Sequence, residues 1–382
     1  METIIRQSVG IDIAKATFTA CICTQMRESK LGQVVQFENN KRGFNQLLKW
    51  VRKNVSAPGE VVFVMEATGI YYEPLAYHLN KLHFKLAVLL PNKVKHYAKS
   101  LNVKSKTDLI DARIIAQMGA ERVLDLWQPP SPVLKTLREV TRLYTDLKVE
   151  RTCFENRLQS IEAGNEPAKF IVQSTQSVIR KLDNEIEKCK TQIEQLIKSE
   201  KWLEQKAKNL LTIKGVGVIT VAIVIAETQG FKLITNVRQL ASYAGYDVVE
   251  RQSGGSIKGR TRISKKGNSR IRAALHFPAL VASRHNSELK QVYQRINEKK
   301  PSKMVGATAI QRRILVLLYT LWKNDTTYQQ RSKEDTSGNQ ETKPLLRLND
   351  EVVAKKTGRP TSLPAQDELP SNRSTEALLR LT

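Results

Sequence analysis

The chain has 382 residues, enough for about two or three domains with hydrophobic cores of their own, which excludes a mini-protein that depends on disulfides or metal. Its 62 Lys and Arg residues outnumber its 37 Asp and Glu residues, and a net charge of +25 on a folded chain favours a polyanionic partner such as nucleic acid. The four cysteines lack zinc-finger spacing, and the longest apolar stretches fall short of roughly 20 residues, so we expect a cytoplasmic protein without structural zinc or a membrane partner.

The N-terminal part of the chain alternates between strand and helix patterns. Runs of β-branched and alternating apolar residues predict strands, two of them within residues 8–24 and the others at residues 33–37, 60–65 and 85–90. Apolar residues at helical spacing predict helices at residues 42–51 and 71–82. This alternation is typical of an α/β domain with a mixed sheet, which we place at residues 1–127.

The middle of the chain has a helical period. After a proline-rich segment at residues 128–132, apolar residues recur every three or four positions over residues 137–161 and again over residues 179–196. Two such seams joined by a breaker predict an antiparallel helical hairpin or coiled coil at residues 128–206, with ordinary bundle helices as the alternative. The seams also suggest that subunits associate.

The C-terminal third predicts a mainly helical domain at residues 207–330. It opens with a turn that contains Gly215 and Gly217 before an apolar helix. This turn suits either a helix-hairpin-helix contact, in which backbone amides approach a DNA phosphate, or a plain packing turn. Residues 331–382 are polar, contain four prolines and lack periodicity, which predicts a disordered tail.

Four carboxylates stand where a fold could bring them together. Asp12 lies in an apolar strand, where a carboxylate is costly unless a cation or hydrogen-bond donors compensate it, and Glu66 ends a second apolar strand. Asp108 and Asp111 share one face of a predicted helix. Converging carboxylates can hold one or two Mg²⁺ ions, or Mn²⁺, for phosphoryl transfer. A salt-bridged strand residue and a charge favoured by the helix dipole are the alternatives for Asp12 and Asp108.

A basic segment follows at residues 250–272, and its glycines predict a loop rather than a helix. Its cations stand without an acid after Glu250 and repel one another unless phosphates lie between them, so we expect the segment to bind nucleic-acid backbone. These cations are Arg251, Lys258, Arg260, Arg262, Lys265, Lys266, Arg270 and Arg272. Ser253 lies among them, where cations and a nearby metal could promote its attack on phosphorus. On the residues alone, a linker serine beside glycines is the alternative, and Ser256 is the rival nucleophile.

The chain resembles the DEDD transposases of the insertion sequence 110 family, whose relatives include the Piv and MooV DNA invertases. The resemblance covers about residues 8–322. It is carried by the segments VGIDIAKATF, VFVMEATGIYYEPLAYHL, LPNKVKHYAKSLNVKSKTDLIDARIIAQMG and LASYAGYDVVERQSGGSIKGRTRISKKGNSRIRAAL. It implies an RNase H-like (RuvC-like) nuclease domain, a coiled-coil middle and a C-terminal transposase domain.

The resemblance also implies roles for individual residues. Asp12, Glu66, Asp108 and Asp111 fall on the family's metal-binding tetrad, and Ser253 in RQSGG falls on its nucleophilic serine. Implied partners are double-stranded donor and target DNA, a structured non-coding guide RNA, and further copies of the chain in a dimer or tetramer. The function that the resemblance implies is RNA-guided, Mg²⁺-dependent cleavage and rejoining of DNA strands by the transposase of an insertion sequence. Two other interpretations remain: a junction resolvase or invertase, and a nucleic-acid-binding protein without catalysis. Val248 departs from the pattern, because many relatives have proline there.

Overall fold

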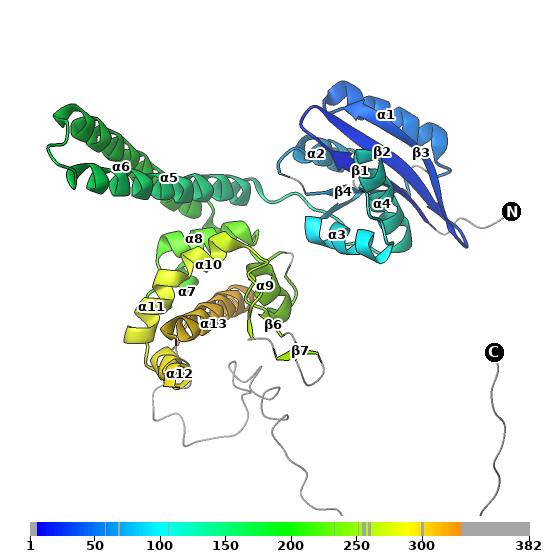
Figure 1. Ribbon diagram of the computed structural model, residues 1–382. Helices are drawn as coiled ribbons and strands as arrows, with labels where there is room; N and C mark the ends of the chain where they lie inside the picture. Colours follow the sequence, from blue (N-terminus) through cyan, green and yellow to red (C-terminus); the bar gives the residue numbers. More distant parts are fainter. Residues whose placement is uncertain are drawn as a thin grey trace, which may run out of the picture. The chain divides into compact units, whose positions relative to one another are not determined.

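The computed structural model describes residues 6–57, 59–67, 69–105, 107–232, 234–250, 252–253, 257–258, 261–298 and 302–329. The chain divides into two units, Met1–Tyr328 and Gln329–Thr382, and the elements below all belong to the first (Figure 1). The tail that we predict to be disordered lies outside the described residues.

A mixed five-stranded sheet forms the N-terminal region, with the strand order β3-β2-β1-β4-β5. β1 pairs antiparallel with β2, and β2 with β3, whereas β1, β4 and β5 run parallel to one another. The strands are β1 Arg6–Ile13, β2 Thr17–Gln25, β3 Ser29–Glu38, β4 Val62–Glu66 and β5 Lys85–Leu89. All the predicted strands are present, and this mixed sheet with its helices fits the α/β, RNase H-like fold expected from the sequence.

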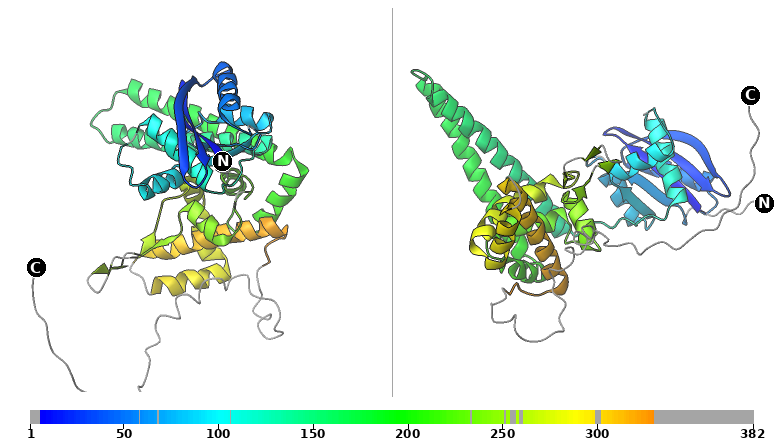
Figure 2. Two further views of the ribbon diagram at one scale, coloured as in Figure 1. Left: turned by 90° about the vertical axis from the view of Figure 1, so that its right-hand side faces the viewer. Right: turned by 60° about the horizontal axis from the view of Figure 1, so that its bottom comes forward.

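Helices cover both faces of this sheet (Figure 2). α1 (Lys41–Asn54) and α2 (Glu73–Lys81) pack on the face that carries Val9 and Phe63. α3 (Pro91–Ser100) and α4 (Asp108–Glu121) pack on the face that carries Val64. α3 is not among the predicted helices, because Pro91 directly follows the strand predicted at residues 85–90 and so indicates only where that strand ends. Proline also begins helices, since its fixed φ suits the first helical position, and that is its place here.

Two long helices follow, α5 (Pro132–Glu162) and α6 (Lys169–Lys198), and they pack against each other (Figure 1). Ile186 and Ile193 of the predicted seam are buried within the single chain. Arg151 is polar but occupies a seam position within residues 137–161, and it pairs with Asp183 and Glu155. α5 and α6 thus form a helical hairpin, and much of its apolar face is used inside one chain. The coiled-coil assignment, the domain boundaries and the association of subunits stay predictions.

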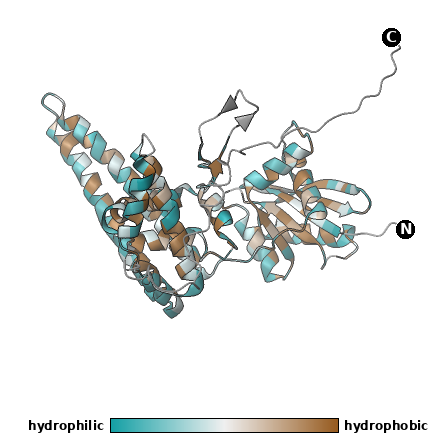
Figure 3. Ribbon diagram, turned by 90° about the horizontal axis from the view of Figure 1, so that it is seen from below, coloured by the Kyte–Doolittle hydropathy of each residue, from teal (hydrophilic) through white to brown (hydrophobic). Residues whose placement is uncertain are grey.

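The remaining helices share one hydrophobic core with the adjoining ends of α5 and α6. They are α7 Lys201–Leu211, α8 Val218–Glu227, α9 Val237–Ala244, α10 Ser269–Ala274, α11 His276–His285, α12 Ser287–Glu298 and α13 Lys303–Asn324. The hydrophobic residues lie in bands along the helices (Figure 3). α13 is longer than its predicted apolar stretch and could cross a membrane by length and composition alone. Ile310, Ile314 and Leu318 have no exposed surface, so we interpret α13 as a core helix.

Candidate active site and nucleic-acid interface

Two of the predicted ligands lie at the ends of neighbouring parallel strands. β1 and β4 pair in register up to Ile11 and Met65. Asp12 and Glu66 are the next residues of the two strands, so they reach the same edge of the sheet. This edge, named here the carboxylate edge, also receives the end of β5, because Leu89 is the register partner of Glu66.

Both strand carboxylates occupy the face of the sheet that α4 covers. Residues of a strand alternate between its two faces, so Asp12 shares a face of β1 with Gly10. α4 packs so closely there that a Cβ at Gly10 would overlap its backbone. Glu66 shares a face of β4 with Val64, which contacts α4 at Gly119.

α4 runs antiparallel to β1, and this direction decides where its first turn lies. Gly119 lies against Ser8, and Ala112 lies against Gly10, so helix numbers fall as strand numbers rise. Two strand residues advance about 6.6 Å, the length of roughly four or five helical residues. Continuing this progression places the first turn of α4 level with Asp12.

The first turn of α4 supplies the other two predicted ligands, Asp108 and Asp111. Thr107 caps the helix, its hydroxyl accepting a hydrogen bond from the Ile110 amide at 3.3 Å. The partial positive charge of a helix N-terminus favours carboxylates in this turn. Asp108 is exposed and the other three carboxylates are partly exposed, so all four are accessible. The strand register and the direction of α4 indicate that they lie toward the same edge of the sheet.

In the described structure, the four carboxylates are not arranged as a metal-binding site. Among the described residues, no group of three or more His, Cys, Asp and Glu side chains is arranged to hold a metal ion. Asp12, Glu66 and Asp111 each make other polar or electrostatic contacts. Four carboxylates are nevertheless the hard oxygen donors that Mg²⁺ and Mn²⁺ prefer. The backbone arrangement fits such an ion, whereas ligation itself stays a prediction.

The serine segment spans residues 248–268, and its described part contains short paired strands rather than only the loop that its glycines predict. β6 (Val248–Val249) pairs with β9 (Arg262–Ile263), and β7 (Gln252–Ser253) pairs with β8 (Ile257–Lys258). Ser253 is the register partner of Ile257. The Ser253 and Lys258 side chains lie outside the described part of the chain, as do Arg251, Ser256 and Arg260. Their roles stay predictions.

The other predicted DNA-binding cations differ in their exposure and in the contacts that their side chains make. Arg262, Lys265 and Lys266 are exposed. Arg270 forms an ion pair with Asp146 of α5 at 3.0 Å, so a counter-charge that sequence reasoning did not foresee comes from another element. The Arg272 Nη1 donates to the carbonyls of Ala244 and Gly267 at 2.8 and 3.0 Å, which fixes the end of the serine segment.

The two glycines of the α7–α8 turn also differ from each other. Gly215 has a φ of +92°, and a Cβ there would lie 2.9 Å from a methyl carbon of Val281, so this glycine has a packing role. Gly217 is the N-cap of α8, and nothing lies within 4 Å of its would-be Cβ. Contact of either amide with phosphate stays a prediction.

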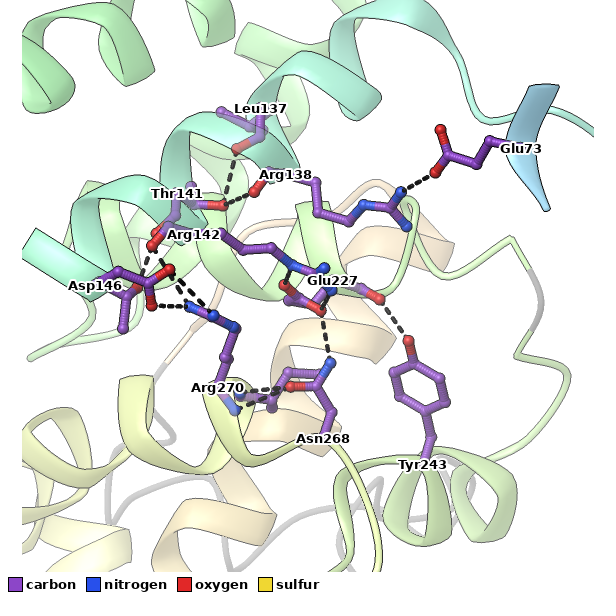
Figure 4. Close-up of polar contacts among 12 residues, drawn as sticks. Glu73, Leu137, Arg138, Thr141, Arg142, Asp146, Glu227, Tyr243, Asn268 and Arg270 are labelled. Atoms are coloured by element: carbon purple, nitrogen blue, oxygen red, sulfur yellow. Dashed lines mark hydrogen bonds and ion pairs between the residues drawn. The ribbon is translucent and has the colours of Figure 1, made fainter. Parts of the chain in front are cut away.

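A polar cluster around the buried carboxylate of Glu227 connects to the end of the serine segment (Figure 4), and the sequence did not predict it. Glu227, the last residue of α8, has a side chain only 2% exposed. Its two oxygens accept hydrogen bonds from Arg142 of α5 at 2.7 and 2.9 Å, and one also accepts from the Asn268 amide at 2.7 Å. Asn268 in turn caps α10. One carboxylate thus ties α5, α8 and the end of the serine segment together.

The ionisation of Glu227 depends on these partners. Burial by itself raises the pKa of a carboxyl, but hydrogen bonds from Arg142 and Asn268 outweigh it and hold the pKa of Glu227 below its ordinary value. The same contact raises the pKa of Arg142. A signal was present in the sequence, since Glu227 ends an apolar run, VITVAIVIAE, much as Glu66 ends its strand.

Comparison with known proteins identifies relatives of this chain among transposases and DNA-inverting proteins. Residues 9–161 match the DEDD transposases of the IS110 type, and residues 207–294 match the transposase IS116/IS110/IS902 family. The pilin gene-inverting protein of Moraxella lacunata is 32% identical over 332 residues, which cover 85% of this chain and 98% of that protein. The pilin gene-inverting protein of Moraxella bovis is also 32% identical, over 329 residues.

Among solved structures, Thermus thermophilus RuvC is similar at 9% identity with a TM-score of 0.25, covering 32% of this chain and 99% of RuvC. That score is too low to establish a shared fold. The sequence matches are sufficient, and they place the protein among the transposases, which are DNA recombinases. The chain belongs to the IS110 family of DEDD transposases, which confirms the resemblance seen in its sequence.

Proposed function

We propose that this protein cuts and rejoins DNA strands to move an insertion sequence, with Asp12, Glu66, Asp108 and Asp111 holding Mg²⁺ or Mn²⁺. The observation that supports this is the carboxylate edge, where two strand ends and the first turn of a helix meet. When bound there, the ion stabilises charge that develops at a reacting phosphate. The four carboxylates bind and orient it, and the close packing of β1 on α4 keeps them in register.

We propose Ser253 as the nucleophile. Its hydroxyl oxygen attacks a DNA phosphorus, the bond from that phosphorus to one deoxyribose oxygen breaks, and the serine proton is released while the leaving oxygen gains one. A phosphoserine ester and a free sugar hydroxyl result. Attack on this ester by a sugar hydroxyl of another strand reverses the exchange, so the bond is rejoined without an external energy source. Cations of the serine segment, such as Arg262, stabilise the phosphate charge.

We further propose that a structured guide RNA pairs with donor and target DNA, that the chain acts as a dimer or tetramer, and that it works in the cytoplasm. The family resemblance supports these proposals, and the net charge of +25 is consistent with two nucleic-acid partners. Lys and Arg side chains on backbone phosphates give affinity without reading bases. Base pairing by an RNA would then supply the sequence specificity.

Inversion of a DNA segment is the second candidate, because the Moraxella relatives are named for inverting a pilin gene. Inversion uses the same cutting and rejoining, so it differs in the arrangement of the DNA sites rather than in the chemistry. A plasmid with two sites in inverted orientation distinguishes the two. Inverted products without excision or insertion would favour the invertase.

The test of the chemistry is denaturing electrophoresis of end-labelled DNA after reaction with Mg²⁺. The wild-type protein should give a covalent protein–DNA band that is absent from Ser253→Ala and retained in Ser256→Ala. The reverse pattern would move the nucleophile to Ser256. Active enzyme without any such band would favour a resolvase that uses water, and no cleavage at all would favour a binding protein.

A further inference from the structure

The segment between β5 and α4 carries a strongly basic surface. Residues 74–107 contain no Asp or Glu. Within this stretch Lys93, Lys95, Lys99 and Lys104 are all exposed. Among the described residues none of these four lysines forms an ion pair. We name them the α3 lysine surface.

Packing fixes the face of α3 that Lys93, Lys95 and Lys99 occupy, and Lys104 follows the helix. Val94 and Tyr97 are buried against α4, and the Tyr97 hydroxyl donates to Glu121 at 2.6 Å. Arg122 lies over the Tyr97 ring at 4.9 Å. The opposite face of α3 therefore stays exposed, with its lysines on a firmly held helix.

The lysines are placed where they cost stability in the free protein. Lys95 and Lys99 are four residues apart on one helix, and like charges at that spacing repel each other. Lys93 and Lys95 also lie near the helix N-terminus, which has partial positive charge and lacks any acidic residue in its first turn. An anion bound along this face would offset both effects.

The surface lies in the chain between two parts of the carboxylate edge. α3 begins two residues after Leu89, the register partner of Glu66, and it ends eight residues before Asp108. A ten-residue helix is about 15 Å long. At ~3.4 Å per nucleotide along one strand, it spans roughly four phosphates.

We propose that the α3 lysine surface binds the phosphate backbone of the DNA strand that the carboxylate edge cuts. The inference rests on the proposed function for the identity of the substrate. The lysine ammonium is a point charge on a flexible stem, so this surface binds the phosphates of any DNA sequence and does not distinguish between bases. It adds a second DNA contact, on a different domain from the serine segment and fixed relative to the proposed metal ligands.

The experiment compares two charge-matched double variants of the full-length protein. One carries Lys95→Gln and Lys99→Gln, and the control carries Lys188→Gln and Lys190→Gln on α6, whose lysines pair with Glu185 and Glu187. Both are made in an Asp12→Asn background, so that DNA stays uncut. Fluorescence anisotropy then measures binding of a labelled DNA duplex against salt concentration, with a structured RNA measured in parallel.

The α3 variant should weaken DNA binding and reduce the slope of log affinity against log salt by about 1.8, at about 0.9 for each phosphate that the protein no longer neutralises. The control should leave the slope unchanged. An equal fall in both variants, an unchanged slope in the α3 variant, or weaker binding of RNA alone would overturn the proposal. Lys95→Arg with Lys99→Arg should retain binding. If the Gln variant unfolds by circular dichroism, Lys99→Gln alone should show half the effect.

Failure of the proposed function gives a different result. Retained strand cleavage in Asp12→Asn would refute the metal site and leave the DNA contact of α3 standing. Normal salt dependence in the α3 variant, with cleavage lost in Asp12→Asn, would refute only the lysine surface.

Discussion

The carboxylate edge is set by the register of a sheet and the packing of a helix on it, whereas the serine segment rests on two pairs of two-residue strands. In the first region, ligand positions follow from backbone contacts such as Gly10 on α4. In the second region, the position of the serine segment depends on side-chain hydrogen bonds at its C-terminal end, above all those of Asn268 and Arg272. The two halves of one proposed active site should therefore respond differently to mutation, the first through its ligands and the second through these hydrogen bonds.

The largest effect should come from the ligands of the carboxylate edge. Asp12→Asn or Asp111→Asn should abolish DNA strand cleavage, because loss of a metal-bound carboxylate removes several kcal/mol of transition-state stabilisation. Folding and RNA binding should change little. A gel-based cleavage assay with Mg²⁺ measures this, with Glu60→Gln as a control for an exposed carboxylate of the same domain. Cleavage at the wild-type rate by either variant would refute the assignment of these residues as metal ligands.

The next largest effect should come from the polar cluster at the end of the serine segment. Glu227→Ala removes a buried carboxylate and leaves Arg142, whose side chain is 44% exposed, without its partner. Because water can solvate this arginine, the loss should lie at or below the lower end of the roughly 3–5 kcal/mol that breaking a fully buried ion pair costs. Urea denaturation should show the loss, while Glu204→Ala, which breaks an exposed pair with Lys208, should leave stability nearly unchanged. Similar stability of Glu227→Ala and the wild type would mean that the cluster is dispensable.

The same residue predicts a pH dependence. The folded state lowers the pKa of Glu227, so its ionisation contributes stability above the unfolded value of about 4.5, and this contribution is lost as pH falls through the folded pKa. Wild-type stability should therefore fall more steeply below about pH 4.5 than that of Glu227→Gln. Parallel curves of unfolding free energy against pH would contradict the ion pair.

A smaller effect on stability should come from the packing that sets the carboxylate edge. A Cβ at Gly10 would lie 2.0 Å from the backbone nitrogen of Ala116, so Gly10→Ala must push α4 away from β1. Overpacking of this kind costs about 1–3 kcal/mol. Gly59→Ala is the matched control, since nothing lies within 4 Å of its Cβ position. Equal unfolding free energies for the two variants would mean that α4 is not held this closely.

The smallest effect should come from a pair of cations in the serine segment. Replacing Arg260 and Arg262 with Ala should weaken binding to all DNA sequences alike and reduce the salt slope by about 0.9 for each phosphate that these arginines neutralise. Titrations at several salt concentrations provide the slope. An unchanged slope would mean that these two arginines do not contact DNA phosphates.

The sequence predicted the elements whose pattern is local. Alternation and helical spacing located every strand of the sheet, and the two seams located α5 and α6. α3 was missed because proline both ends strands and begins helices, and only the structure decides between these roles. The convergence of Asp12 with the first turn of α4 could be expected from residue type, but its geometry needed the strand register. The Arg142–Glu227 pair joins residues 85 positions apart, which no local pattern reveals.

α13 has a consequence for how the protein is made. The core of the C-terminal region joins Leu134 and Leu137 to Ile310, Ile314 and Trp322, so it cannot close until α13 has been synthesised. At about 5–20 residues per second, the ribosome needs roughly 10 to 40 s between these two parts. The α/β region, complete by Glu121, can fold during this interval. Ribosome stalling or truncation ahead of α13 should therefore yield a folded N-terminal region attached to an aggregation-prone remainder, which limited proteolysis of nascent chains would detect.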